Sequence, residues 1–179
     1  MGAEEKSAAL KKVKCDIYDG LVRDLLDVKA YALAQVIYSE KMREKFEMTI
    51  EDHLTGLEIY AVQKKLADYQ GSFKEILYSE TFPITQATCE EFGRTLQHFN
   101  SEEEKAARMK MTEQLHSKIQ LEDIKISNKL FDSLVYVFTE SQMWSKINSM
   151  LASATPNNCD PSQPTIDFLK KNLVYCFDP

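Results

Sequence analysis

The 179-residue chain is poor in the residues that interrupt regular structure, with only five glycines and five prolines. These two residues mark turns and helix ends, so their scarcity favours long helices over many short strands. Hydrophobic residues make up 44% of the chain and charged residues 28%, as in ordinary globular domains. A chain of this length buries enough surface to fold without a metal or disulfides. We therefore predict an all-α protein.

The sequence also lacks the motifs that commonly carry catalysis or ligand binding. It contains no phosphate-binding glycine loop, no dinucleotide-binding fingerprint and no EF-hand loop. Its three histidines, His53, His98 and His116, have no local partner that would form a nucleophile–base pair. A Glu-x-x-His segment occurs once, from Glu113 to His116, whereas a di-metal helical bundle needs two. We predict a non-enzymatic protein with no cofactor, no metal site and histidines on helix surfaces.

Cysteine pairs and apolar targeting segments are missing as well. Cys15, Cys89, Cys159 and Cys176 are widely separated, without a Cys-x-x-Cys pair, which predicts free thiols in a reducing compartment. No apolar run near the first residue resembles a signal peptide. No stretch approaches the roughly 20 apolar residues of a membrane span. These absences predict a cytoplasmic protein without a membrane span.

An excess of basic residues is absent too, because 22 lysines and arginines stand against 28 acidic residues. The net charge is −6 and the pI is about 5.2. Nucleic-acid backbones and anionic membranes reward clustered lysine and arginine. The charge of this acidic protein therefore argues against nucleic acid as its partner and leaves another protein as the expected one.

What the sequence does contain is apolar residues at steps of three and four, the spacing of amphipathic helices. One stripe runs from Leu10 to Val36 and predicts a single long helix, or two helices broken near Gly20. The stripe lacks a strict heptad repeat and sustained flanking charge pairs, so we expect it to pack within the chain and not to self-associate. A second long helix is predicted from Thr49 to Leu77, bent near Gly71.

Capping residues mark the other helices. Ser or Thr at an N-cap accepts a hydrogen bond from the first turn, and a Glu or Gln three residues later completes a capping box. The predicted N-caps are Thr85, Ser101, Ser127 and Thr165. The sequence shows no internal repeat. It predicts one domain: a bundle of about six to seven helices with mostly antiparallel neighbours over residues 1–153, a proline-containing loop over 154–164, and a C-terminal helix over 165–179.

The most apolar stretch is Asn128 to Leu151, which includes the only tryptophan, Trp144. Its first half is predicted to form the core, through Leu130, Phe131, Leu134, Val135 and Phe138. Thr139 and Gln142 match a second capping box, so the stretch is either one helix or two that meet near Glu140.

Two hypotheses for function follow. The first is a cytosolic adaptor domain that binds a partner protein through an apolar helical groove, with the C-terminal helix docked on the bundle or on the partner. The expected partner-binding residues are Trp144, Ile147, Leu151, Phe168, Leu169 and Phe177. The alternative is a helical protein that encloses a lipid or haem among Phe99, Phe131, Phe138 and Trp144. The sequence leaves the oligomeric state open.

Overall fold

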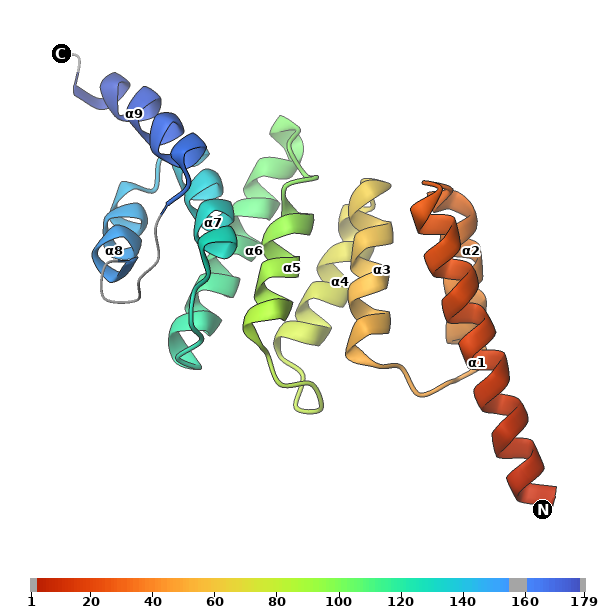
Figure 1. The fold of residues 1–179 in the computed structure, drawn as a ribbon. Helices are drawn as coiled ribbons and strands as arrows, with labels where there is room; N and C mark the ends of the chain where they lie inside the picture. The colour runs from red at the N-terminus through yellow and green to blue at the C-terminus, as the bar shows by residue number, and fades with distance from the viewer. Residues whose placement is uncertain (1–2, 155–160, 178–179) are drawn as a thin grey trace. The chain divides into compact units, whose positions relative to one another are not determined.

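Figure 1 shows the fold in a computed structural model, which describes residues 3–154 and 161–177 and the side chains of residues 5–152 and 161–172. Within these ranges all regular structure is α-helical, which confirms the predicted fold class. The helices are α1 (Ala3–Asp27), α2 (Tyr31–Arg43), α3 (Ile50–Val62), α4 (Leu66–Leu77), α5 (Gln86–Leu96), α6 (Glu102–Leu121), α7 (Asn128–Glu140), α8 (Trp144–Ala154) and α9 (Gln163–Phe177). The described ranges thus contain nine helices, so the predicted six to seven was too few.

The additional helix ends come from residues in the left-handed conformation. Lys29, Lys64 and Gln142 have φ values of 59°, 58° and 55°, and each follows the last turn of a helix. The next amide in each case donates to the carbonyl five residues back, as Ala30 N does to Leu25 O at 2.7 Å. This is the Schellman motif, which usually has glycine at the left-handed position. Helix breaks therefore lie at lysines and a glutamine, and Gly20 and Gly71 stay inside α1 and α4.

The predicted N-caps agree well with the helix starts. Thr49 forms a capping box with Asp52, and Ser101 forms one with Glu104. The side chains of Thr85 and Ser127 each accept from the third amide of their helix. The break inside 128–151 is real but has a different cause, because Thr139 is buried within α7 and the left-handed residue after α7 ends it.

The chain divides into two compact units, residues 1–72 and residues 73–179. In unit 1, α1 and α2 form a helical hairpin and α3 packs against α2. Its core consists of Val22, Ala34, Tyr38 and Ile59, with partly buried neighbours that include Leu25 and Leu26.

Gly56 explains how closely α3 approaches α2. A Cβ built on this glycine would lie 2.6 Å from Cζ of Tyr38, inside van der Waals contact. The Tyr38 ring also meets Tyr60 edge-on, with centroids 6.3 Å apart. The absence of a side chain at residue 56 thus lets the tyrosine fill the interface between the two helices.

In unit 2 the odd-numbered helices stack in succession. α5 packs against α7 and α7 against α9, while α6 contacts both α5 and α7, and α8 contacts α7 (Figure 1). Along the sequence, α5, α7 and α9 begin at Gln86, Asn128 and Gln163, intervals of about 42 and 35 residues that are typical of helical repeats. Unit 2 therefore has the contact pattern of a helical-repeat array, although its sequence shows no repeat.

The core of unit 2 is built from aromatic and branched residues of α5 to α8. The predicted core residues of α7 are buried, as are Ile147 and Met150 of α8. Phe99, Phe131 and Phe138, proposed above as neighbours of a lipid or haem, are at most 1% exposed and belong to this packed core. Across residues 3–154 and 161–177, no helix is long and apolar enough to cross a membrane.

The apolar stripe of α1 is only partly covered. Val22, Leu25 and Leu26 pack in the core of unit 1. Four residues nearer the start of the helix remain 45–69% exposed: Leu10, Val13, Ile17 and Leu21. Val28 and Val36, which belong to the predicted stripe, are 72% and 56% exposed. The expectation that the whole stripe packs within the chain is therefore wrong for these six residues.

Candidate functional site

The clearest binding surface of unit 2 is a groove along α5, α7 and α9, made of two neighbouring hollows that share Gln97 and Asp132. The first hollow has a volume of about 340 Å³ and lies between α7 and the start of α9; Gln97, Asp132, Tyr136, Ser162, Pro164, Thr165 and Phe168 line it. The ring of Tyr136 stacks on Phe168, with centroids 4.8 Å apart and planes inclined by 23°. Tyr136 remains 38% exposed, so this aromatic pair is accessible at the wall of the hollow.

Hydrogen bonds fix the start of α9 against α7 at this hollow. The amide of Ser162 donates to Oδ1 of Asp132 at 3.1 Å. The hydroxyl of Ser162 accepts from the amide of Thr165 at 3.4 Å, and so caps the first turn of α9 in the place predicted for Thr165. Asp132 therefore sets the position of the helix that carries Phe168.

Tyr136, the other member of the aromatic pair, is held through Glu140 by a buried charged residue, Arg108. Tyr136 hydrogen-bonds to Glu140, one turn further along α7, and Glu140 forms an ion pair with Arg108 of α6. Burial, followed by the charge of Glu140, raises the pKa of Tyr136, so its hydroxyl stays protonated at neutral pH. The Arg108 side chain is only 1% exposed, and in the described part of the chain its Nε and Nη1 have no hydrogen-bond partner. Glu140 is thus the carboxylate that compensates this buried charge.

The second hollow continues the groove between α5 and α7 and has a volume of about 460 Å³. Its lining residues include both acidic and basic side chains; Ala87, Glu90, Glu91, Arg94, Gln97, Lys129, Asp132 and Ser133 line it. Nε2 of Gln97 donates to Oγ of Ser133 at 3.1 Å, which joins α5 to α7 across the floor. Arg94 pairs with Glu91 in a bidentate contact at 2.5 and 3.0 Å. The groove therefore offers amide, hydroxyl and charged groups beside one aromatic anchor.

The residues predicted to bind a partner separate into different environments. Phe168 lies in the groove, whereas Ile147 and Leu169 are 2% and 6% exposed and pack in the core. Trp144 is half-buried at the start of α8, and Leu151 is 36% exposed. The side chain of Phe177 lies outside the described residues. Among the members of this set whose side chains are described, Phe168 is the one that lines the groove.

Sequence reasoning missed Tyr136, Asp132 and Gln97. Tyr136 stands between Val135 and Val137, two buried residues of α7, so its apolar surroundings hide its exposure. Its partner Phe168 lies beyond a proline-containing loop, and the pairing depends on how α9 sits against α7. No local pattern in the sequence indicates how α9 is positioned along α7.

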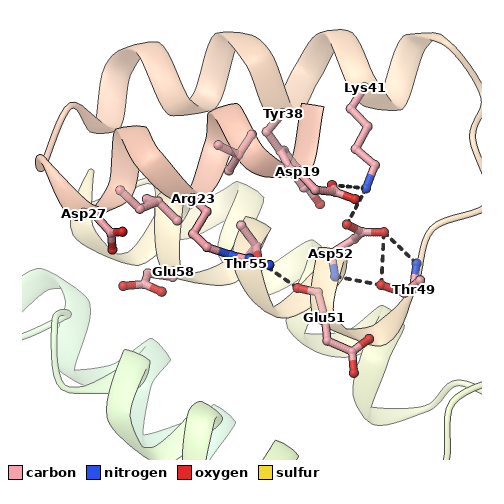
Figure 2. Close-up of a pocket in the computed structure, with 12 residues that line it drawn as sticks. Asp19, Arg23, Asp27, Tyr38, Lys41, Thr49, Glu51, Asp52, Thr55 and Glu58 are labelled. Atoms are coloured by element: carbon pink, nitrogen blue, oxygen red, sulfur yellow. Dashed lines mark hydrogen bonds and ion pairs between the residues drawn. The ribbon is translucent and has the colours of Figure 1, made fainter. Parts of the chain in front are cut away.

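Unit 1 contains a separate cleft of about 520 Å³ whose lining residues include Lys41 of α2 (Figure 2). Lys41 is 1% exposed, and Figure 2 shows Asp19 of α1 and Asp52 of α3 pointing at its ammonium group. Nζ of Lys41 lies 2.5 Å from Oδ1 of Asp52 and also pairs with Asp19. Asp52 accepts in addition from the amide of Thr49 at 2.8 Å. The cluster joins α1, α2 and α3.

The protonation states show what this cluster can do chemically. Burial alone lowers the pKa of Lys41, but the hydrogen bonds that its ammonium group donates to Asp19 and Asp52 outweigh burial and raise the pKa above 10.5. Burial opposes ionisation of Asp52, yet Lys41 and Thr49 together hold its pKa below 3.8. Lys41 is therefore a protonated ammonium at neutral pH, without the lone pair that a nucleophile or Schiff-base lysine requires. The arrangement supports a structural role.

Two of the three histidines, His53 and His116, differ from their predicted partly exposed placement on helix surfaces. His53 and His116 are buried, at 8% and 2% exposure, and His98 is half-buried. The ring of His116 meets Phe138 edge-on with centroids 5.6 Å apart. In the described residues its Nδ1 has no hydrogen-bond partner. Burial, with a smaller contribution from the charge of Lys146, lowers the pKa of His116.

The lowered pKa of His116 predicts a loss of stability in mild acid. The unfolded state binds this proton at a pKa of about 6.5, above the folded pKa, so the free energy of unfolding falls as the pH drops below that value. The slope approaches about 1.4 kcal/mol per pH unit. Urea unfolding at several pH values between 5 and 7 measures this dependence of the free energy of unfolding on pH. His116→Gln should flatten the dependence, and an equally steep slope in that variant would contradict the assignment.

The cysteines and acidic residues add no reactive site within the described residues. Cys15 and Cys89 are free thiols, and burial raises the pKa of Cys89 to about 12, so it is an inert core residue. No group of three or more His, Cys, Asp or Glu side chains in the described ranges is arranged to hold a metal ion.

No protein-family model, curated protein sequence or solved structure matches this chain.

Proposed function

We propose that this protein is a non-enzymatic cytoplasmic adaptor whose helical-repeat unit binds a segment of another protein in the groove along α5, α7 and α9. The observation that carries the proposal is the accessible stack of Tyr136 on Phe168 beside a hollow of about 340 Å³. Aromatic side chains that reach a hollow are typical anchors of protein interfaces, because they bury a large area at little conformational cost.

The polar groups of the groove support a peptide as the ligand. Gln97, Ser133 and Thr165 present an amide and two hydroxyls, which can pair with the backbone N–H and C=O groups of a bound segment. Acidic and basic residues both line the second hollow, so the groove has no strong preference for a polyanion. Stacked helical repeats commonly use such extended surfaces to bind other proteins.

Substitution of the aromatic pair tests this proposal. The full chain is used to capture partners from a cell extract, and the bound segment is then titrated as a synthetic peptide by calorimetry. We expect Tyr136→Ala and Phe168→Ala each to weaken binding by roughly tenfold or more, as loss of an interface anchor does. Tyr78→Ala is the matched control, since Tyr78 is 56% exposed and lines a different hollow of unit 2.

Two results would overturn the proposal. Equal binding by wild type, Tyr136→Ala and Phe168→Ala would remove the groove from the interaction, provided that circular dichroism shows all three folded. A native mass spectrum of the wild-type protein with a bound lipid or haem would favour the small-ligand hypothesis instead. Tyr136→Phe keeps the ring stack and loses the hydrogen bond to Glu140, so retained binding in that variant would assign the effect to the aromatic contact.

A further inference from the structure

We infer that the exposed stripe of α1 binds α1 of a second copy of the chain in an antiparallel pair. The stripe consists of Leu10, Val13, Ile17 and Leu21, which are 69%, 54%, 56% and 45% exposed. α1 touches α2 through a different face, which carries Val22, Leu25 and Leu26. A row of large apolar side chains in water on a helix that is otherwise charged indicates a contact surface.

The positions on this face follow a short heptad pattern. Starting from Lys6, steps of four and three residues alternate through the core positions to Asp24; the series is Lys6, Leu10, Val13, Ile17, Gly20 and Asp24. Alternating steps of this kind place all six side chains along one seam, the arrangement by which two helices pack side by side. The seam has a lysine at its amino-terminal end and an aspartate at its carboxyl-terminal end, with apolar residues between.

Charge decides the direction of the pair. When two α1 helices lie antiparallel and are centred on residue 15, Val13 lies opposite Ile17 of the second copy, and Lys6 lies opposite Asp24. The two-fold axis repeats both contacts, so two opposite-charge pairs close the ends of the apolar seam. A parallel pair in register would instead place Lys6 against Lys6 and Asp24 against Asp24, which is repulsive. The surface is therefore complementary to itself only in the antiparallel direction.

Gly20 supports a close approach at the seam. A glycine inside a helix is unfavourable relative to alanine, and a Cβ at this position would meet nothing within 4 Å. Contacts within the chain thus give no reason for a glycine here, in contrast to Gly56. In the antiparallel pair Gly20 lies opposite Leu10, the most exposed residue of the stripe, and leaves room for its side chain.

The size of the seam sets the strength of the pair. From Leu10 to Leu21 the helix rises about 16 Å, which is short for an interface. Stable protein dimers bury roughly 1,200–2,000 Å² in total, and this contact lies below that range. We therefore expect a weak, concentration-dependent dimer of the whole chain.

Charge reversal on the full chain tests whether α1 binds α1 of a second copy and whether the two helices run antiparallel. Sedimentation equilibrium of the wild type should show a monomer–dimer equilibrium. Lys6→Glu and Asp24→Lys, tested singly, should each lower the association constant by about tenfold or more, because each makes both end pairs repulsive. The double variant Lys6→Glu/Asp24→Lys restores opposite charges and should return the constant to within about twofold of the wild type.

Further variants show whether the α1 stripe itself forms the dimer. Ile17→Asp should abolish the dimer, whereas Leu121→Asp, at a residue that is 78% exposed on α6, should leave it unchanged. A wild type that stays monomeric at high concentration would overturn the inference. A dimer that persists in Ile17→Asp would also overturn the inference. The same holds for a double variant that associates as weakly as the single variants. Single reversals that leave the association constant unchanged would indicate a parallel pair, in which each residue still faces its own copy and the like charges remain, and would also overturn it.

Discussion

Lys41→Met is expected to lower the free energy of unfolding by about 3 kcal/mol, the cost of breaking a buried ion pair by removing one partner. The side chain of Asp52 is only 12% exposed and would lose its counter-charge, while Asp19, at 40%, can recover hydration. Urea unfolding measures the change, and Lys12→Met, on an exposed part of α1, is the matched control. Equal stability of Lys41→Met and the wild type would contradict the structural role of the cluster.

The same cluster sets the sign of a pH dependence. The folded pKa of Asp52 lies below its ordinary value of 3.8, so its contribution to stability is present above that pH and is lost as the pH falls through the folded pKa. The difference between wild type and Lys41→Met should therefore be constant near neutral pH and narrow below about pH 4.

Glu140→Ala is expected to destabilise the protein more than Arg108→Met, although both break the same ion pair. Removing Glu140 leaves the guanidinium of Arg108, 1% exposed, buried without a counter-charge, at a cost of about 3 kcal/mol or more. Removing Arg108 leaves Glu140, whose side chain is 23% exposed and reaches water. Methionine also fills much of the arginine volume, so we expect a loss of about 1 kcal/mol.

Unfolding of the two variants in urea gives this comparison directly, and Glu102→Ala, at an exposed glutamate in the first turn of α6, controls for loss of an acidic side chain. The reverse order, with Arg108→Met less stable, would contradict the assignment of Glu140 as the compensating group. Glu140 also accepts a hydrogen bond from the hydroxyl of Tyr136, and the Tyr136→Phe variant removes that bond while it keeps the ion pair with Arg108.

The starts of α3, α5, α6 and α7 were predictable from their capping residues, whereas the starts of α2 and α4 and the helix ends were not. An N-cap such as Thr49 or Ser101 acts through its own side chain, so its identity reports its role. The left-handed residues after α1 and α3 are lysines, which have no intrinsic preference for that conformation. Burial of the helices on both sides outweighs the local cost, and tertiary packing of this kind has no local signature in the sequence.

The groove was predictable only in part, for a similar reason. Phe168 was expected to bind a partner because it lies on an apolar helix joined by a loop, and the structure places it in the groove. Tyr136 and Asp132 acquire their roles only when α9 packs on α7, since the contacts that join them to α9 span about 30 residues. The buried positions of His53 and His116 likewise depend on packing between helices.

The nearest-neighbour stacking of unit 2 has an evolutionary consequence. α9 contacts α7, and α7 contacts α5, so each of these helices is held by its nearest neighbours in the stack. In arrays of this kind a helix pair can be added or removed when the helices that become neighbours fit each other. The groove can lengthen or shorten in steps of one helix pair, so related chains that differ by such steps could recognise partner segments of different lengths while keeping the same packing rules.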